Sequence, residues 1–378
     1  MKIAILETVH FQYGLAQSEV FGAAEKTFFI TEELHRRMHD YDPALCDGEF
    51  IIIDDLASAA RQIIDKCNGE GIDILLISPI FKEFESLYRI VKETTCTKVI
   101  TIHNLNYWLK SFFRTPKYYR ERKLKQAIVE ACDFIAVEDF LYHHVRTRNP
   151  RLFNRYKFIY IPFTLFHPRT PGRNVKDDPT RFKVVIPGQI NPARRRYEEV
   201  VEVIHHFAWA KAPITFSLPG RPVGDYGKWV TDELDKANRE HPGIAYAFPA
   251  EGTVTTEMFL REMETSDLVL SASSEVFRDL GTKEIYGKTK APGAIYDMMT
   301  FQLPGLLPAH LGVPRNLEGS AFTYASAQEL TRLLEKAMRD RDTYMQWKRK
   351  AESNAYNYTA EAVRKQLPFF APAPVAAQ

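Results

Sequence analysis

The sequence predicts an α/β protein of two domains, each built on a parallel β-sheet that helices cover. Three observations support this class. The chain has 378 residues, which is enough for two domains of ordinary size. Short apolar segments rich in Ile and Val alternate with longer helical patterns, as in a parallel sheet. A stretch rich in Pro, Gly and charge interrupts this alternation near the middle of the chain, and the alternation then begins again.

Six apolar segments in the first half are predicted to be buried strands, and helix-length sequence separates each from the next. They are residues 2–6, 50–54, 72–78, 98–103, 133–138 and 158–162. The segment "HPRTPGRNVKDDPT" (167–180) is dense in Pro, Gly and charge, and it is predicted to be a linker. Residues 1–166 are therefore the expected N-terminal domain.

The second half repeats the pattern, with predicted strands at 182–188, 214–220, 244–249, 268–273 and 303–308. Residues 327–367 are expected to be nearly continuous helix, and 368–378 to be a frayed tail. We expect a C-terminal domain over 181–345 and a C-terminal helix and tail over 346–378. One arrangement open to this helix is to pack back on the N-terminal domain. Two such domains leave a cleft between the carboxyl ends of their sheets, where ligands bind.

Composition excludes several classes of protein. The formal net charge of +2 is too small to imply nucleic-acid binding by itself. The cysteines form no C-x-x-C pair, which argues against a zinc site or a disulfide framework and favours reduced thiols; they are Cys46, Cys67, Cys96 and Cys132. The start "MKIAILETVH" is too short in apolar residues for a secretory signal, and no run has the length of a membrane span. We expect a cytoplasmic protein that can touch the inner face of a membrane.

Two nucleotide-binding motifs are absent. A P-loop requires four residues between its glycines, whereas five residues separate Gly281 from Gly287, and the preceding predicted strand ends well before Gly287. The segments after both first strands carry one glycine each, which argues against the dinucleotide fingerprint of a nicotinamide dehydrogenase.

The segment "YGKTKAPGAIYD" (286–297) still has the features of an anion site. Pro292 and Gly293 stand at a predicted helix start, and Lys288 and Lys290 lie just upstream. The free amides of a first helical turn attract anions. The alternative is an ordinary junction between a loop and a helix, with solvated lysines.

The order and spacing of five segments resemble the GT-B glycosyltransferases, specifically the retaining family 4 ("group 1") type. The resemblance covers most of the chain and is strongest from Phe182 to Pro308. It implies two Rossmann-like domains (GT-B) facing across an interdomain cleft, with the acceptor on the N-terminal domain and a nucleotide sugar on the C-terminal one. The segments are "VITIHN", "CDFIAVEDFLYHHVR" with "KFIYIPF", "FKVVIPGQINPARRRYEEVVEVI", "TTEMFLREMETSDLVLSAS" and "GAIYDMMTFQLPGLLP".

The resemblance implies a donor site on the C-terminal domain. The amides around Gly293 and Ala294, with the turn at Gly188, would hold the diphosphate of a nucleotide sugar. Asp297 falls where the family has a glutamate that accepts hydrogen bonds from the ribose hydroxyls, and we expect it to belong to the catalytic site. The alternative for Asp297 is a first-turn carboxylate that answers the helix dipole.

Arginines are expected to neutralise the diphosphate. The family's lysine position falls within residues 194–196, and we expect Arg194 or Arg195 to fill it, because a planar guanidinium binds phosphate oxygens bidentately. An exposed basic helix start is the alternative. The first acidic residue of the family's paired motif is replaced by Thr289, and Glu275 comes too early unless an insertion folds it back. The sugar, and activity itself, are therefore left open.

On the acceptor side, His103 ends a predicted strand at the cleft, beside Asn104. The resemblance implies that His103 contacts the donor sugar or an acceptor hydroxyl, and makes it the second catalytic candidate. His10 and Tyr13 follow the first strand and are expected to line the acceptor side. A structural role is the alternative for both histidines.

Residues 106–126 combine basic and aromatic side chains. From Lys110 to Lys125 the sequence has seven basic residues and one acidic residue. This composition suits an anionic membrane surface or a lipid-linked diphosphate acceptor. Single-stranded nucleic acid would also fit, but nothing else in the chain supports it. The alternative is a solvated helix with a core-facing aromatic stripe.

We therefore expect a glycosyltransferase of polysaccharide biosynthesis that moves a sugar from a nucleotide donor to a hydroxyl of a glycan or lipid-linked acceptor. The resemblance implies retention of anomeric configuration. Basic residues would replace a metal, and no cofactor is expected. The alternatives are a nucleotide-sugar epimerase of the same architecture and a non-catalytic subunit of a glycan-assembly complex.

Overall fold

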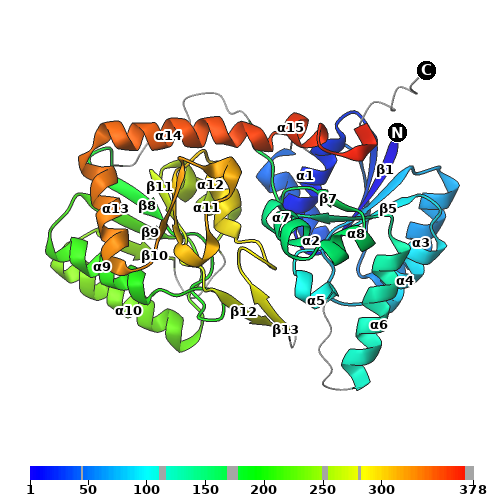
Figure 1. The fold of residues 1–378 in the computed structure, drawn as a ribbon, viewed down its shortest axis with the longest axis horizontal. Coiled ribbons are helices and arrows are strands. Elements are labelled where there is room, and N and C mark those ends of the chain that lie inside the picture. Colours follow the sequence, from blue (N-terminus) through cyan, green and yellow to red (C-terminus); the bar gives the residue numbers. More distant parts are fainter. Residues whose placement is uncertain (44–45, 110–115, 168–177, 249–253, 280–281, 371–378) are drawn as a thin grey trace.

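The computed structural model describes residues 1–43, 46–109, 116–167, 178–248, 254–279 and 282–370. They form two domains side by side, each with a central parallel sheet and helices around it (Figure 1). The predicted α/β class with two parallel sheets is confirmed. Most of the predicted linker, residues 168–177, and the end of the predicted tail, residues 371–378, lie outside the described residues.

The N-terminal sheet has seven parallel strands in the order β3-β2-β1-β4-β5-β6-β7. Its central strands are buried on both faces because helices cover both, which explains their continuous apolar sequence. Six of the strands match the predicted segments. Strand β2 (Glu25–Ile30) was missed because its apolar segment is short and a charged helix follows it almost at once. The strands are Lys2–Glu7 (β1), Glu25–Ile30 (β2), Glu49–Ile52 (β3), Ile74–Ile77 (β4), Thr97–Thr101 (β5), Phe134–Val137 (β6) and Phe158–Tyr160 (β7).

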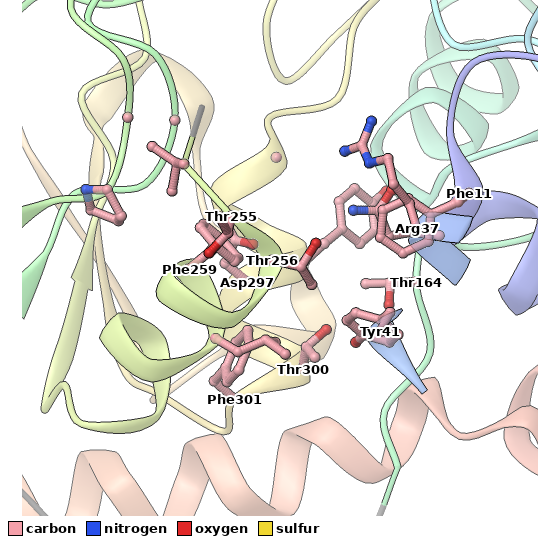
Figure 2. A pocket seen from close by; sticks show the side chains of 18 of the residues that line it. Phe11, Arg37, Tyr41, Thr164, Thr255, Thr256, Phe259, Asp297, Thr300 and Phe301 are labelled. Carbon is pink, nitrogen blue, oxygen red and sulfur yellow. The ribbon is translucent and has the colours of Figure 1, made fainter. Parts of the chain in front are cut away.

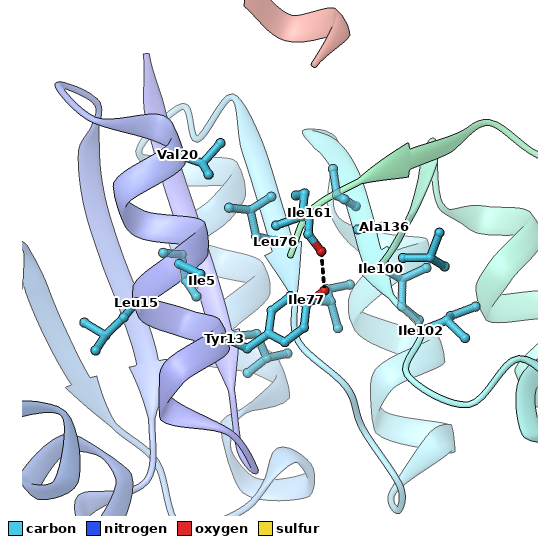
Figure 3. Close-up of a cluster of buried hydrophobic side chains, with 14 of the residues drawn as sticks. Ile5, Tyr13, Leu15, Val20, Leu76, Ile77, Ile100, Ile102, Ala136 and Ile161 are labelled. Carbon is cyan, nitrogen blue, oxygen red and sulfur yellow. Dashed lines mark hydrogen bonds between the residues drawn. The ribbon is translucent and has the colours of Figure 1, made fainter. Parts of the chain in front are cut away.

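The helices of this domain pack their apolar faces on the sheet. Tyr13 belongs to such a face: its side chain is fully buried, and its hydroxyl donates to the carbonyl of Ile161 at 2.9 Å (Figure 3). The expectation that Tyr13 lines the acceptor side is therefore wrong. The helices are Phe11–Phe21 (α1), Glu32–Tyr41 (α2), Leu56–Gly69 (α3), Phe84–Glu93 (α4), Leu105–Leu109 (α5), Pro116–Ala131 (α6), Asp139–Arg148 (α7) and Pro150–Arg155 (α8).

The C-terminal sheet has six parallel strands in the order β10-β9-β8-β11-β14-β15. Five of them match predicted segments, and the edge strand β15 was missed. The strands are Phe182–Val185 (β8), Ile214–Leu218 (β9), Ala245–Ala247 (β10), Leu268–Leu270 (β11), Gly305–Pro308 (β14) and Ala321–Tyr324 (β15). The helices are Glu198–Trp209 (α9), Gly224–Glu240 (α10), Thr256–Glu264 (α11), Gly293–Thr300 (α12) and Ala327–Arg339 (α13).

In both sheets the strand order changes direction at the first strand of the domain, β1 or β8. The loops after the strands on either side of this point diverge, so a crevice forms at the carboxyl ends of the strands. The two crevices contribute to one cavity between the domains.

An antiparallel hairpin interrupts the C-terminal domain between β11 and α12. Its strands are Val276–Asp279 (β12) and Thr282–Ile285 (β13), and it extends toward the N-terminal domain beside α5 (Figure 1). The hairpin is an insertion that brings the chain back on itself, because the amide of Tyr286 donates to the carbonyl of Glu275 at 3.0 Å.

The C-terminal segment leaves its own domain and lies against the N-terminal one. Helix α14 (Arg341–Ala355) crosses over, and α15 (Ala360–Arg364) lies beside α1 (Figure 1). Arg364 donates to the carbonyls of Val20 and Glu19 at 2.8 and 3.1 Å. The predicted continuous helix is broken at Asp340, whose carboxylate accepts from the amide of Thr343 and so begins α14. None of the helices in the described part of the chain combines the length and apolar character that a membrane span requires.

Candidate active site

A cavity of about 440 Å³ lies between the two domains (Figure 2). Its C-terminal wall is made by the turns after β8 and β9 and by the first turns of α11 and α12. Its N-terminal wall is made by the start of α1, by α2 and by the segment after β7, and it includes Phe11, Arg37, Tyr41 and Phe163. Of the predicted site residues, Gly188, Gly293 and Asp297 line the cavity; the others do not.

The turn after β8 places an arginine behind the cavity wall. Gly188 has φ +97°, and a Cβ there would stand 1.8 Å from Nη2 of Arg195. The guanidinium of Arg195 therefore lies directly on the glycine, and its Nη1 donates to the carbonyl of Gln189 at 3.2 Å. Arg194 is exposed, and its guanidinium lies 5.1 Å from the centroid of the Phe277 ring. Arg195 thus lies against the Gly188 turn, and its charge also acts on the carboxyl of Asp297.

Helix α12 presents its first turn to the cavity. Pro292 is the residue before the helix, and Gly293 is its first residue. A Cβ at Gly293 would have no atom within 4 Å, so the backbone is open to a ligand there. Ala294 is buried and does not line the cavity, which leaves only its amide available for the predicted role.

Asp297 lies one turn further along α12 and is only partly accessible, from the cavity. Burial raises the pKa of its carboxyl to about 7, and the charge of Arg195 acts in the opposite direction. The carboxyl of Asp297, whose ionised form is disfavoured by burial, faces the same cavity as Gly188 and Gly293. Asp297 can therefore accept hydrogen bonds from the hydroxyl groups of a ligand whose anionic group lies at the first turn of α12.

His10 and His103 form a ring cluster one layer behind the cavity wall. Their centroids lie 5.4 Å apart, and Phe163 lies 5.4 Å from His10 and 5.6 Å from His103. Phe163 also contacts Tyr296 of α12, with centroids 5.7 Å apart, so the cluster joins both domains. Burial lowers the pKa of His10 to about 3, with further contributions from the positive charges of neighbours such as His103, so His10 is neutral at pH 7.

Two buried glutamates that the sequence analysis missed support this cluster. Nδ1 of His103 lies 2.8 Å from Oε1 of Glu138, although their relative orientation is not that of a hydrogen bond. Glu7 accepts from the amides of Val9 and His10 at 2.7 Å each, and burial raises its pKa to about 7. Glu7 ends β1 and Glu138 directly follows β6, and both strands were predicted, so a polar residue at the carboxyl end of a buried strand was the available signal.

The two lysines predicted to bind the donor do not reach the cavity. Lys288 is exposed and lies outside its wall. Lys290 is buried, and its Nζ donates to Oδ1 of Asn104 at 2.7 Å. These two donor-binding calls, and the acceptor-binding call on Asn104, are corrected: the Lys290–Asn104 pair joins the domains to each other.

The basic and aromatic stretch 106–126 divides between core and surface. Trp108 and Lys125 are buried, and Nζ of Lys125 lies 3.1 Å from the centroid of the Tyr107 ring. Burial lowers the pKa of Lys125 to about 8. Tyr119 and Arg120 are exposed, and residues 110–115 lie outside the described residues. Within the described ranges, no group of three or more His, Cys, Asp or Glu side chains could hold a metal ion.

No protein-family model matches the sequence, and no curated protein matches it either. Solved structures do match. A UDP-forming α,α-trehalose-phosphate synthase from Burkholderia xenovorans has a TM-score of 0.62 at 10% identity, over 97% of each chain. HepE from Anabaena, solved in complex with UDP, has a TM-score of 0.59 at 13% identity, over 97% of this chain and 98% of that one. The chain has the GT-B fold.

The structure of an epimerase also matches this chain: the UDP-GlcNAc 2-epimerase from Neisseria meningitidis, solved with UDP-GlcNAc. It matches with a TM-score of 0.51 at 11% identity, over 97% of this chain and 98% of that one. At these identities the likeness establishes the fold and not the reaction. The reaction must be argued from the cavity between the two GT-B domains.

Proposed function

We propose that the protein is a glycosyltransferase that moves a sugar from a nucleotide diphosphate donor to a hydroxyl of a glycan or lipid-linked acceptor. One observation carries this proposal: the Gly188 turn, the first turn of α12 and the carboxyl of Asp297 line one cavity between the domains. Two of the structures with the same fold were solved with UDP or a UDP-sugar. Their ligands support a nucleotide sugar in the corresponding cavity here.

In this proposal the C-terminal domain binds the leaving group. The amides at Gly293 and the guanidinium of Arg195 behind Gly188 neutralise the diphosphate while the bond from the anomeric carbon to its oxygen breaks. Asp297 accepts hydrogen bonds from the ribose hydroxyls. These fixed charges stabilise the departing diphosphate without a metal.

The N-terminal domain binds the acceptor, whose hydroxyl oxygen forms the new bond to the anomeric carbon while its proton passes to the departing diphosphate oxygen. Phe163 is the member of the His10–His103–Phe163 cluster that lines the cavity and positions the acceptor, and His103, with Glu138 beside it, is proposed to act on the transferred sugar from behind this wall once the domains close. Closure between the domains excludes water and so suppresses hydrolysis. Retention of configuration is part of the proposal, as is contact of the 106–126 stretch with an anionic membrane.

The test is calorimetry with a panel of nucleotide sugars, followed by product analysis with glycan and lipid-linked acceptors. We expect one nucleotide sugar to bind, with release of its nucleoside diphosphate only when an acceptor is present. Absence of binding across the panel would contradict the proposal.

The likeness to a UDP-GlcNAc 2-epimerase favours a second candidate, conversion of the donor itself. Mass spectrometry and chromatography of UDP-GlcNAc incubated with the protein alone separate the two: an epimerase yields an isomer of equal mass, and a transferase does not. A non-catalytic subunit would bind partners without either product.

A further inference from the structure

The β12–β13 hairpin and the turn after it form a polar contact between the domains, separate from the cavity. Glu284 on β13 accepts from two consecutive amides of the N-terminal domain, those of Tyr107 at 2.8 Å and Asn106 at 3.3 Å. Its side chain is 1% exposed. A buried carboxylate is stable only where such donors replace water.

The neighbouring residues complete the contact. Asn106 donates from its side chain to the carbonyl of Lys283 at 2.7 Å and to Oγ1 of Thr289 at 3.3 Å. The amide of Leu105 donates to the carbonyl of Thr289 at 2.9 Å. With the Lys290–Asn104 pair, four consecutive residues of the N-terminal domain, 104–107, are all bonded to the hairpin and its turn. We call this set of contacts the latch.

The latch fixes the position of His103. Residues 104–107 follow His103 directly, so the contacts that hold them also determine where the end of β5 lies relative to the donor-binding domain. Separation of the domains would break every one of these bonds and hydrate Glu284 and Lys290. The buried polar groups therefore have these protein partners only in this arrangement of the two domains.

The latch also accounts for Thr289, which stands where the resembled family has an acidic residue. Its Oγ1 accepts from the amide of Ile285 at 2.8 Å and from Asn106, and the residue is 4% exposed. Thr289 also hydrogen-bonds to the side chain of Glu284, so a carboxylate at position 289 would lie beside a second buried carboxylate. The side chain points into the latch and does not line the cavity.

We propose that Glu284 and Thr289 are positioning residues that hold the end of β5, and with it His103, in one place relative to the donor-binding domain. The catalytic consequence of this proposal rests on the proposed function, but the existence of the latch does not. Glu284→Ala removes the carboxylate that accepts hydrogen bonds from both amides. Thr289→Val removes the hydroxyl group but keeps the shape of the side chain. Lys283→Ala is the matched control, since its exposed side chain lies on the same hairpin and only its backbone takes part.

The first measurement is hydrogen exchange of peptides covering 104–109. We expect exchange at Asn106 and Tyr107 to accelerate about 100-fold in Glu284→Ala, and by a smaller factor in Thr289→Val, with Lys283→Ala like wild type. The second is turnover of the nucleotide sugar that binds best, for which kcat should fall at least about tenfold in Glu284→Ala with KM within about twofold. Unchanged exchange in both variants would overturn the latch.

The outcomes distinguish the two proposals. If wild-type protein neither binds nor consumes any nucleotide sugar, the proposed function fails, and exchange alone then decides the latch. If exchange accelerates but kcat is unchanged, the positioning role is wrong. Should Glu284→Ala not fold, Glu284→Gln and Thr289→Val provide the same comparison. Thr289→Glu gives a final check, because it should open the latch and lower turnover, whereas a rise in turnover would contradict the assigned role.

Discussion

Replacing Asp297 with asparagine tests two opposite effects of its carboxylate: it should lower the stability of the free protein, and it should raise the affinity for the nucleotide sugar. Burial raises the pKa of the carboxyl from 3.8 to about 7. A carboxyl whose pKa is raised by folding binds its proton more tightly in the folded state, so stability falls as pH rises from about 4 to above 7. Since each pKa unit is worth about 1.4 kcal/mol, ionised Asp297 lowers the free energy of unfolding by at most roughly 4 kcal/mol.

Asp297→Asn should therefore be more stable than wild type at pH 8, by about 1–3 kcal/mol after allowance for its partial access to water, and nearly equal at pH 4. Nucleotide binding should change in the opposite direction. Hydrogen bonds to a charged acceptor contribute about 1.5–3 kcal/mol, so affinity for the nucleotide sugar should fall roughly 10- to 100-fold at pH 8. The loss should shrink at pH 6, where the wild-type carboxyl is largely protonated.

Urea unfolding at pH 4 and pH 8 measures the first effect, and calorimetry with the same nucleotide sugar at pH 6 and pH 8 measures the second. Asp235→Asn is the control, because this carboxylate is exposed on α10 of the same domain. A gain in stability together with weaker binding is expected only for Asp297. If Asp297→Asn bound the nucleotide sugar as tightly as wild type at pH 8, the ribose role would be refuted.

Three further predictions concern the same cavity. Gly188→Ala should lower the free energy of unfolding by about 1–3 kcal/mol and weaken nucleotide binding, because φ is +97° and the new Cβ would meet Arg195; Gly69→Ala, with open space around it, should do neither in urea unfolding and calorimetry. Arg195→Gln should weaken binding of the nucleotide sugar about 10- to 100-fold by calorimetry, whereas the control Arg196→Gln, which changes the exposed neighbouring arginine, should have little effect. Equal affinities of Arg195→Gln and wild type would show that Arg195 does not bind the diphosphate. His103→Gln should lower turnover at least about 100-fold with the affinity for donor within about twofold, and full turnover would show that His103 is structural.

Most of the fold could be predicted because the central strands are buried on both faces. Burial of that kind produces the runs of Ile and Val that the sequence shows at β1, β4 and β8. The missed elements lack such runs. Strand β15 reads "AFTY" at the sheet edge, and the hairpin strands "VFRD" and "TKEI" carry charge: Arg278 and Lys283 are exposed, and Glu284 bonds to the other domain.

The cavity-lining residues that lie in local strand-turn-helix segments were predictable. Gly188 and Asp297 each follow from the turn or helix that carries them. Lys290 was misassigned because its partner, Asn104, lies 186 positions away in the sequence, and no local pattern shows such a contact. The burial of Tyr13 and the role of Thr289 likewise depend on packing between distant segments.

The most direct test of the account is the position of a bound nucleotide in a crystal soaked with UDP. The account predicts the diphosphate between the Gly188 turn and the first turn of α12, with Arg195 behind it and the ribose hydroxyls on Asp297. A nucleoside diphosphate bound away from this cavity, or bound in it with its ribose out of reach of Asp297, would contradict the account.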